Sequence, residues 1–510
     1  MLNRFGLVVT SLMLLAGVVA MPEGNVRAQA PKAGGMLRFA VRAEPSTLDP
    51  HRGSSGSDHM SLYPIYDTLV RFDPNSMAPQ PGLAESWETP DPKTLVLTLR
   101  KNVKFHDGTP FNAEAVRYNL LRAQDKKIST VVSELAAVEA VEIVDSHKVR
   151  LRLKHPDAAI LLVLSDRSGM MVSPTTAAKL GDQFGRSPVG AGEYRFVKWA
   201  PGESIRVEKF AEYWDTGRPY LDAILIRIMP DGDTRLSALR SGQLDFTMEI
   251  PPQDFASLKT ERGIKTHERV TLAYWRIYLN MSKPPFDKRA AREAVQYAID
   301  RPALLKTIMF GLGELTVTPF PSVHWAHNPS LKPFPHDPGK AKAKLAEAGL
   351  PNGFSFDMVL ESAPEHVRRA EAIQAQLAQI GVRVDLKPME LVKGVGLFFR
   401  SKEVAAANYR WTGRPDPDQT VRGMFHSTGF YNPGKWQNAK LEALMDQAAA
   451  SYKLEDRRKL YGQIDELIQQ EAADVGLFFA PALEASSAGV QGYQQNLLGK
   501  PMFRGVWLQK

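Results

Sequence analysis

The sequence predicts an α/β protein with at least two lobes. Three observations lead to this prediction. The chain has 510 residues, more than one hydrophobic core normally serves. Short alternating strands dominate the N-terminal part, whereas longer helices followed by strands dominate the part after Tyr274. Hydrophobic residues make up 44% of the chain, which is enough apolar material for separate cores.

The N-terminal part shows strand and turn signals. Leu95, Leu97 and Leu99 alternate with other residues before a His-Asp-Gly turn at 106–108, which predicts a hairpin-like edge. Asn112 precedes Ala-Glu-Ala-Val and predicts a capped helix start. The remaining elements expected here are strands at 149–153, 193–197, 205–210 and 224–229, and a helix at 234–241 that Gly242 ends.

The C-terminal part shows helix-then-strand units. Apolar residues from Val367 to Ile380 recur at helical spacing, Gly381 ends that helix, and alternation at 382–386 predicts a strand. Another helix at 460–468 leads into an apolar run at 475–479, which predicts a buried strand returning to the first lobe. We expect the Pro-rich residues 318–338 to form an extended surface loop.

The first thirty residues have the three parts of a secretory signal. They are a basic start at Arg4, an apolar run from Phe5 to Ala20, and a small-x-small cleavage site at 28–30. An uncleaved membrane anchor is the alternative. Since the chain has no cysteine, a lipid-anchored N-terminal cysteine and disulfides are excluded. These features predict a soluble protein exported to a bacterial periplasm.

The charge of the chain argues against nucleic acid as a partner. Removing residues 1–30 takes away Arg4, Arg27 and Glu23, which lowers the formal net charge from +8 to +7. The basic residues are interleaved with acidic ones rather than gathered in runs.

Residues 409–418 have the composition of a ligand-binding loop. The span is Tyr-Arg-Trp-Thr-Gly-Arg-Pro-Asp-Pro-Asp. Trp411 offers a flat apolar face, Arg410 and Arg414 offer bidentate donors, and Gly and Pro residues form a turn. An ordinary surface loop capped by its own aspartates is the alternative.

Several strings, in this order along the chain, resemble the extracytoplasmic solute-binding proteins of family 5, which feed peptide, oligopeptide and nickel ABC importers. They are Ser-Thr-Leu-Asp-Pro at 46–50, Pro-Gly-Leu-Ala-Glu-Ser-Trp at 81–87, Leu-Arg-Lys-Asn-Val-Lys-Phe-His-Asp-Gly at 99–108, Pro-Val-Gly-Ala-Gly-Glu-Tyr at 188–194, Tyr-Leu-Asn at 278–280, Ala-Val-Gln-Tyr-Ala-Ile-Asp at 294–300, and residues 411–418. Together they cover nearly the whole mature chain.

The resemblance implies the two-lobed periplasmic-binding-protein fold, of type II and the large cluster C form, with an extra α/β subdomain in the first lobe. The chain would cross between lobes near 271–278 and again near 479–484. The expected division is a signal peptide at 1–30, lobe I at 31–60, 186–273 and 481–510, its extra subdomain at 61–185, and lobe II at 274–480.

The resemblance also implies a function. A peptide or peptide-like solute would bind in the cleft and favour the closed form, which ABC permease subunits in the inner membrane would recognise. We expect a monomer that has no cofactor, no metal site and no enzymatic activity.

Arg414 departs from the pattern of the family. Members that bind free peptides usually have an aspartate three positions after the tryptophan, where it pairs with the N-terminal ammonium. An arginine cannot replace it, because like charges repel in a poorly screened cleft. Either Asp416 takes that role, or the solute presents an anion or a neutral acceptor to Arg414. We favour the second alternative, because an arginine is suited to bidentate contact with a carboxylate or phosphate. A third interpretation is that Arg414 only bridges Asp416 and Asp418.

Further candidate ligand-binding residues follow from position. Tyr274 and Trp275 lie at the first crossing, Phe479 lies at the second, and Thr47 belongs to the first family string. Packing or a turn explains each of these equally well. Thr412 and Gly413 belong to the tryptophan loop. Arg368 and Arg369, at a helix start, loosely resemble basic residues that some members aim at a ligand carboxylate.

Other signals indicate other functions. Residues 429–435 match a phosphate-binding loop as far as Lys435, but Trp436 replaces the required hydroxyl, so a loop before a helix at 439–450 is the better interpretation. His324 and His327 raise the question of a metal, and surface histidines are the favoured explanation. An anionic or sugar-containing molecule and chelated nickel are the alternative ligands. A secreted hydrolase is the alternative from another class, although no nucleophile or zinc motif is present.

Overall fold

The computed structural model describes residues 30–53 and 58–509. All but the last residue of the predicted signal peptide, at 1–30, lies outside the described residues. In the described part, no helix is both long enough and apolar enough to span a membrane.

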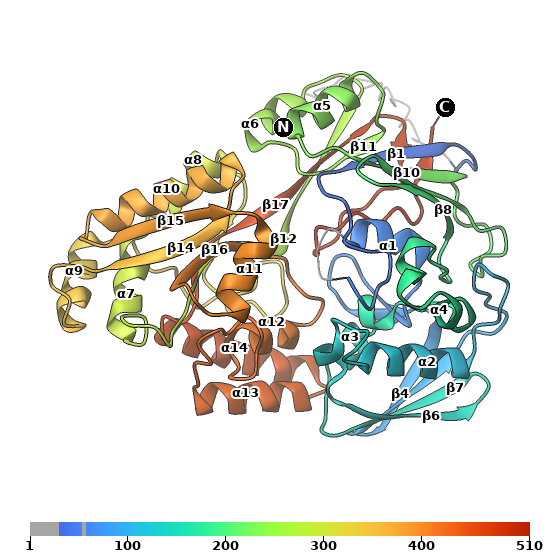
Figure 1. The fold of residues 1–510 in the computed structure, drawn as a ribbon, viewed down its shortest axis with the longest axis horizontal. Coiled ribbons are helices and arrows are strands. Elements are labelled where there is room, and N and C mark those ends of the chain that lie inside the picture. The colour runs from blue at the N-terminus through green and yellow to red at the C-terminus, as the bar shows by residue number, and fades with distance from the viewer. Residues whose placement is uncertain (1–29, 54–57, 510) are drawn as a thin grey trace, which may run out of the picture. The chain divides into compact units, whose positions relative to one another are not determined.

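The part of the chain from residue 32 onward is built around one mixed sheet, in which the two middle strands are long. Among the described residues it has eleven strands, in the order β15-β14-β16-β12-β17-β11-β1-β10-β9-β8, with β13 paired to β17 (Figure 1). The middle strands are β12 (Ile264–Leu279) and β17 (Val475–Ser487). The strands β15, β14 and β16 lie on one side of this central pair, and β11, β1, β10, β9 and β8 lie on the other side. The sheet therefore has two halves.

We call these halves lobe I and lobe II. Lobe I contains β1 (Met36–Val41), β8 (Tyr194–Ala200), β9 (Ser204–Lys209), β10 (Ala223–Ile228) and β11 (Phe246–Thr247). Its helices are α1 (His59–Ile65), α3 (Ile160–Val163), α4 (Pro174–Leu180), α5 (Gly232–Arg240) and α6 (Pro252–Leu258), with short 3-10 helices at Val132–Leu135, Arg167–Gly169 and Gly181–Arg186. The C-terminal tail returns to lobe I, where β18 (Val490–Gln491) pairs with β19 (Trp507–Leu508).

Lobe I also contains a separate four-stranded sheet with its own core. The strands are β4 (Ala84–Asp91), β5 (Thr94–Leu99), β7 (Lys148–Leu153) and β6 (Val138–Asp145), all antiparallel, and α2 (Ala113–Gln124) packs on them. A small ribbon of β2 (Val70–Phe72) and β3 (Pro79–Pro81) precedes this sheet. Leu95, Leu97 and Leu99 are buried, and Asn112 accepts a hydrogen bond from Ala115 N. The predicted strand and helix cap are therefore confirmed. The predicted edge is wrong, because β5 lies between β4 and β7, and an isolated bridge between Lys104 and Pro110 spans the turn at 106–108.

Lobe II is a helix-covered sheet. Its strands are β14 (Ser355–Glu361), β15 (Arg383–Met389) and β16 (Ala406–Trp411), with β13 (Glu314–Leu315) on β17. Its helices are α7 (Arg289–Ala298), α8 (Arg301–Met309), α9 (Pro338–Glu347), α10 (Pro364–Ala378), α11 (Leu391–Val395) with a π-helical turn at Gly396–Arg400, α12 (Pro417–Phe425), α13 (Ala439–Ala450) and α14 (Leu454–Gln470). The predicted unit of helix, glycine and strand is confirmed by α10, Gly381 and β15, because Gly381 has a φ of 84° after the helix.

The loop before α9 differs from its prediction. Residues 318–336 lack regular structure as expected, but Thr318, Phe320 and His324 are buried. The phenyl ring of Phe320 stacks on the imidazole of His324 and contacts the ring of Tyr461 on α14. This segment packs on the core of lobe II, so the expectation of a surface loop was wrong for these residues.

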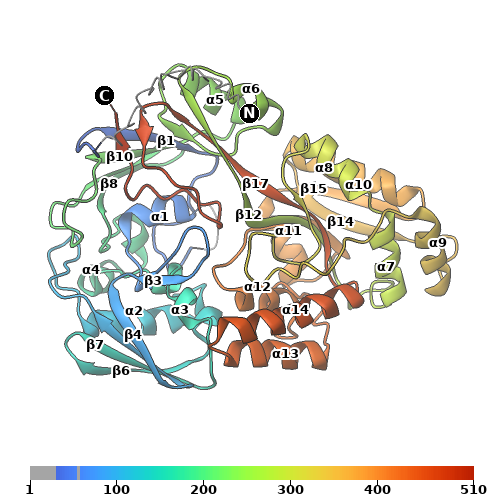
Figure 2. The ribbon, with the colours of Figure 1, turned by 180° about the vertical axis from the view of Figure 1, so that it is seen from behind.

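The two middle strands change register where they pass from one lobe to the other. Figure 2 shows β12 and β17 side by side between the two lobes. Val270 pairs with Pro481 and Tyr274 pairs with Phe479, so a register shift lies between these two pairs. The backbone of this segment is held partly by other groups, since Leu272 N donates to Leu497 O at 2.8 Å. The shift falls inside the predicted crossing segments, while the predicted domain boundaries stay a prediction.

Candidate ligand-binding site

The tryptophan loop joins the end of β16 to the start of α12. Gly413 has a φ of 74°, and a Cβ atom there would lie 2.5 Å from the Cβ of Leu272. Glycine is therefore required both for the backbone conformation and for the close approach. Trp411 is buried, and its indole N–H donates to Thr420 Oγ1 at 3.3 Å. Its ring lies edge-on to the ring of Tyr431, with 4.9 Å between the ring centroids.

Arg414 packs on this tryptophan and forms hydrogen bonds within its own loop and to Tyr431. Its guanidinium carbon lies 4.8 Å from the ring centroid of Trp411. It donates to Thr412 Oγ1 at 3.2 Å, to Gly413 O at 2.7 Å and to Tyr431 OH at 3.3 Å. All three acceptors are neutral, so the interpretation of Arg414 as a bridge between Asp416 and Asp418 was wrong.

Charged residues of lobe I act on Arg414: burial would lower its pKa, but Tyr431, Glu134 and Asp166 raise it. Asp166 accepts a hydrogen bond from His59 Nε2 at 2.7 Å and caps the short helix that begins with Arg167. Ser168 Oγ donates to Glu134 Oε2 at 2.5 Å. Together with Lys500 of the C-terminal tail and with Trp411, Arg414 and Tyr431 of lobe II, residues Glu134, Asp166 and Arg167 form a group that we call the Arg414 cluster.

The pKa values in the cluster reflect its burial and its mixture of charges. Burial lowers the pKa of Lys500 to about 8; Asp166 opposes this shift, and Arg414 and Arg167 add to it. Burial would raise the pKa of Asp166, but His59 and Lys500 hold it well below its usual range. Burial lowers the pKa of His59 to about 4, so this histidine is neutral at pH 7. At that pH the cluster has three cations and two anions, a net charge of +1.

Asp416 fixes the end of the tryptophan loop where α12 begins. Its carboxylate receives Arg457 Nη2 at 2.6 Å and Nη1 at 2.9 Å, and both side chains are buried. It also caps α12 in a capping box with Gln419. Because this carboxylate is occupied by a bidentate arginine, a free role for Asp416 with a ligand ammonium has little structural support.

The candidate residues divide between two faces of the sheet. In the register of β12 and β16, Tyr274 is opposite Trp411 and Trp275 is opposite Arg410. Since successive side chains of a strand point to opposite faces, Trp411 and Arg410 are on different faces. Tyr274, Phe479 and Trp411 share one face, and Trp275 and Arg410 share the other.

The face with Trp275 is filled by ion pairs and stacking. The guanidinium of Arg369 lies 3.3 Å from the ring centroid of Trp275 and donates to Asn408 Oδ1 at 3.0 Å. Arg410 pairs with Glu249 of lobe I at 3.5 Å. Arg42 of lobe I pairs with Glu249 at 3.6 Å and with Glu361 of lobe II at 3.5 Å.

The other candidates are held by neighbours. Tyr274 is fully buried, donates to Asp474 Oδ2 at 2.8 Å and contacts the ring of Phe479. Thr47 is partly buried, and its Oγ1 accepts from Asp49 N at 3.1 Å in the turn that leads to α1. Arg368 lies beside Arg369 on α10, but only Arg369 is buried.

Lobe II touches the four-stranded part of lobe I directly. Ala158 N donates to Ala449 O at 2.7 Å, and Tyr452 OH donates to Pro92 O at 2.9 Å. With the ion pairs of Arg42 and Arg410, these contacts join the lobes at two sides of the crossing strands.

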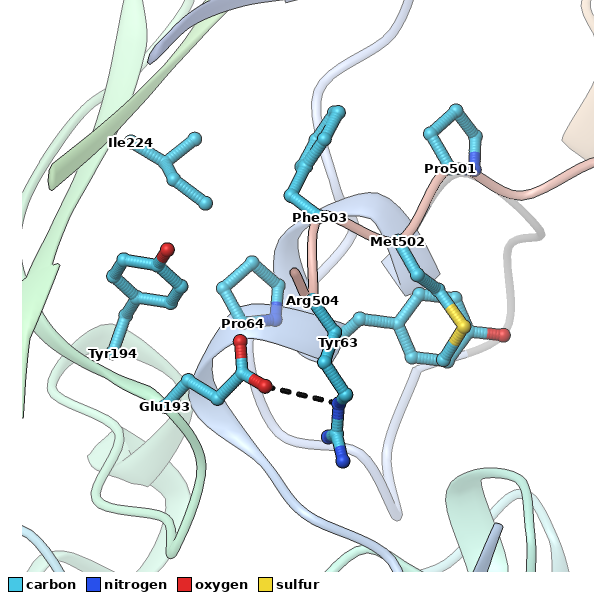
Figure 3. A pocket seen from close by; sticks show the side chains of 9 residues that line it. All are labelled: Tyr63, Pro64, Glu193, Tyr194, Ile224, Pro501, Met502, Phe503 and Arg504. Atoms are coloured by element: carbon cyan, nitrogen blue, oxygen red, sulfur yellow. Dashed lines mark ion pairs between the residues drawn. The ribbon is translucent and has the colours of Figure 1, made fainter. Parts of the chain in front are cut away.

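A small pocket in lobe I lies beside the tail segment that follows Lys500. It is lined by Tyr63, Pro64, Glu193, Tyr194, Ile224 and residues 501–504 (Figure 3). Glu193 pairs with Arg504 at 2.9 Å. Burial raises the pKa of Glu193 to about 8, and Asp67 adds to this shift. The pocket belongs to the inside of lobe I, and Arg504 holds the tail there.

Within the described residues, no group of three or more histidine and acidic side chains is arranged to hold a metal ion. His324 is buried between aromatic rings rather than exposed, so its prediction as a surface histidine was wrong. Residues 429–435 form a loop before α13, as predicted.

Five residues of the cluster were not found from the sequence: Glu134, Asp166, Arg167, Tyr431 and Lys500. All but Tyr431 are far from Trp411 along the chain, and Tyr431 lies in the loop at 429–435, where the sequence did not connect it to Trp411. The one available signal was Lys500 itself, a single charge inside Leu-Leu-Gly-Lys-Pro-Met-Phe at 497–503.

The comparisons with known proteins place this geometry in a family. The profile of "Bacterial extracellular solute-binding proteins, family 5 Middle" matches residues 78–432, more than half of the chain. The chain is a member of this family. The predicted resemblance is therefore confirmed.

Individual relatives match over nearly the whole chain. The glutathione-binding protein GsiB of Escherichia coli (strain K12) is 31% identical over 478 residues, covering 89% of this chain and 91% of that protein. The structure of DppA from Helicobacter pylori with peptide STSA has a TM-score of 0.86 and 27% identity, covering 94% of this chain and 99% of that chain. AgaA from A. tumefaciens R10 with agropinic acid gives 0.85 and 27%, covering 93% and 99%.

These matches confirm the predicted fold class, an α/β two-lobed periplasmic-binding-protein fold. They also confirm the general function, because family 5 proteins are the solute-binding components of ABC importers. The relatives are transport proteins that bind peptides or small molecules and work with permease subunits.

Proposed function

We propose that this protein binds a peptide-like solute with at least one carboxylate between its two lobes, in the periplasm, and delivers it to the permease of an ABC importer. It works as a monomer after removal of residues 1–30, and no bond of the solute is made or broken. The observation that supports this most strongly is Arg414, which stacks on Trp411 and faces lobe I without a carboxylate partner among the described residues.

Lobe motion about the crossing strands supports the mechanism. Two strands connect the lobes at their register shift, and the tail segment at Leu497 braces one of them. A solute that contacts both lobes binds the closed form more tightly than the open form, so it shifts the population toward closure.

The choice of a carboxylate rests on the residue at position 414 and on the relatives. A guanidinium binds a carboxylate through two parallel hydrogen bonds. Glutathione, peptide STSA and agropinic acid are the compounds that the names of three relatives mention, and each of these compounds has a carboxylate. The alternative in which Asp416 binds an ammonium is less favoured, because Arg457 already occupies Asp416.

The experiment is a thermal-shift screen of the mature protein. The panel contains glutathione, di- to tetrapeptides including STSA, agropinic acid, neutral sugars and the nickel–histidine complex. A compound that binds only the folded protein raises the melting temperature. We expect carboxylate-bearing peptides or opines to give the largest shifts and to be recovered unchanged. A panel in which only neutral sugars shift the melting temperature would contradict the proposal, and so would turnover of a bound compound, which is the result that a hydrolase gives.

A further inference from the structure

Lys500 is a buried cation with an unused ammonium group. Its side chain is 95% buried, since the residue is 5% exposed. Among the described residues, no hydrogen bond or ion pair engages its Nζ atom, whereas Asn496 Nδ2 donates to its carbonyl oxygen at 2.7 Å. A buried lysine normally has a partner for its charge, because removing an ammonium from water is unfavourable.

The tail holds Lys500 in this place. Arg504, four residues further on, pairs with Asp67 at 2.7 Å and with Glu193 at 2.9 Å, so the segment from 501 to 504 is fixed in lobe I (Figure 3). On the other side of Lys500, Leu497 and Leu498 are buried. Lys500 is therefore positioned by both flanks rather than free to turn outward.

One carboxylate oxygen of each acid near Lys500 is bound to other groups. Asp166, with which it interacts electrostatically, accepts from His59 and from the backbone N–H of Arg167. Glu134 accepts from Ser168. The remaining charges that act on Lys500 are the cations Arg167 and Arg414. Closure of the lobes thus brings Arg414 of lobe II toward two cations of lobe I.

We propose that Lys500 and Arg414 bind one anionic group of the solute from opposite lobes, and that the closed form depends on this anion. The inference rests on the proposed function and names the feature of the solute that the cluster selects. Without an anion, the cations of the two lobes repel each other in a poorly screened environment. With a carboxylate between them, the repulsion becomes two charge-assisted contacts.

Proton uptake accompanies binding. Burial lowers the pKa of Lys500 to about 8; Asp166 opposes this shift, and Arg414 and Arg167 add to it. A bound carboxylate favours the ammonium form and raises this pKa again. Near pH 8 to 9 the lysine is partly neutral before binding and charged afterwards, so a fraction of a proton is taken from solution. Affinity consequently falls as the pH rises above 8.

The test is calorimetric titration of the best carboxylate ligand from the panel into four proteins: wild type, Lys500→Met, Lys500→Arg and the exposed control Lys198→Met. We expect Lys500→Met to weaken binding by at least about 10-fold and to abolish proton uptake, measured at pH 8.5 in buffers of different ionisation enthalpy. Lys500→Arg should restore most of the affinity without the proton uptake, and Lys198→Met should match wild type. Equal affinity and equal proton uptake in wild type and Lys500→Met would overturn the inference while leaving the proposed function intact.

A second measurement separates the two proposals. Sodium acetate, the smallest carboxylate probe, is compared with sodium chloride at equal ionic strength by thermal shift. We expect acetate to stabilise wild type more than Lys500→Met. If no panel compound binds wild type, the proposed ligand class is wrong; if acetate in addition stabilises both proteins equally, the anion site at Lys500 is wrong as well.

Discussion

The two faces of the crossing strands each place an arginine on a tryptophan, and the two arginines differ in the residues around them. On one face Arg369 lies 3.3 Å from the ring centroid of Trp275, and Asn408 and His366 contact its guanidinium. On the other face Arg414 lies 4.8 Å from the centroid of Trp411, and its hydrogen bonds to described residues go to Thr412, Gly413 and Tyr431.

The surroundings of the two arginines also differ. Next to Arg369, ion pairs of Arg42, Arg410, Glu249 and Glu361 join the lobes. Next to Arg414, lobe I presents Lys500 and Arg167, together with acids that other residues already bind. Neutral groups bind both guanidiniums, so a stacked arginine alone does not indicate a ligand site; the feature that distinguishes Arg414 is the group of charges that lobe I presents to it.

The largest expected effect concerns Asp416, which holds the tryptophan loop through Arg457 and has no expected contact with the solute. Asp416→Ala leaves Arg457 as an unpaired buried charge, which destabilises a protein by about 3–5 kcal/mol. Urea denaturation measures the loss. The surface pair of Arg52 with Asp182 provides the control, since Asp182 is 82% exposed and Asp182→Ala should change stability by less than about 1 kcal/mol.

The double variant Asp416→Ala/Arg457→Met sharpens this result, because it removes both charges. It should recover much of the lost stability. A fully stable Asp416→Ala protein that no longer binds solute would instead mean that Asp416 is a ligand residue.

The next effect compares the two arginines directly. Arg414→Met should weaken binding of a carboxylate ligand by about 10-fold or more, since a charge-assisted contact is lost. Arg369→Met should leave the affinity within about 3-fold, because the structure places Arg369 on the other face. Calorimetric titration measures both, with exposed Arg262→Met as the control. Equal losses for Arg414→Met and Arg369→Met would remove the distinction between the faces.

A smaller effect concerns the contact between the lobes at Ala158 and Ala449, next to Asp157. Burial raises the pKa of Asp157 to about 6, and Asp418 and Asp416 of lobe II add to this shift, whereas Ala159 N–H and His155 oppose it. If separation of the lobes returns the pKa of this carboxyl toward its usual value of 3.8, closure takes up protons between about pH 4 and pH 6.

Affinity should therefore rise as the pH falls from 7 to 5. Asp157→Asn should abolish this rise and strengthen binding at pH 7 by about 1 kcal/mol, measured as Kd at both pH values. A wild-type Kd that does not change between pH 7 and pH 5 would show that Asp157 is not coupled to closure.

The smallest effect concerns the ion pairs between the lobes beside Trp275. Glu249 pairs with both Arg42 and Arg410, and its side chain is 27% exposed. Glu249→Gln should weaken binding by no more than about 1 kcal/mol, because partly exposed ion pairs contribute little. Small-angle scattering without solute should show a larger radius of gyration. An unchanged radius together with unchanged affinity would mean that these pairs do not stabilise closure.

Local signals in the sequence predicted the elements and the family, but only part of the cluster. Asn112 as a helix cap, Gly381 as a helix end and the alternation at 95–99 were confirmed, because each depends on neighbours within a few residues. Trp411 and Arg414 were found because they share one loop. The other five residues, Glu134, Asp166, Arg167, Tyr431 and Lys500, were missed, since only the folding of separate segments brings them together with this loop.

Side-chain burial was the other property that the sequence did not predict. Residues 318–336 are irregular as predicted, yet Phe320 and His324 pack against α14, and a run rich in proline does not reveal that contact. In the same way, the period of two along β12 and β16 separates Arg410 from Trp411, but their register is needed to place Trp275 beside Arg410.

The most direct test is a crystal structure of the mature protein with the best carboxylate ligand of the panel. We predict that the carboxylate lies on the Trp411 face within about 3.2 Å of the Arg414 guanidinium, with Lys500 Nζ at a similar distance from the same group. A ligand bound on the Trp275 face, or inside lobe I in the pocket of Figure 3, would contradict the account.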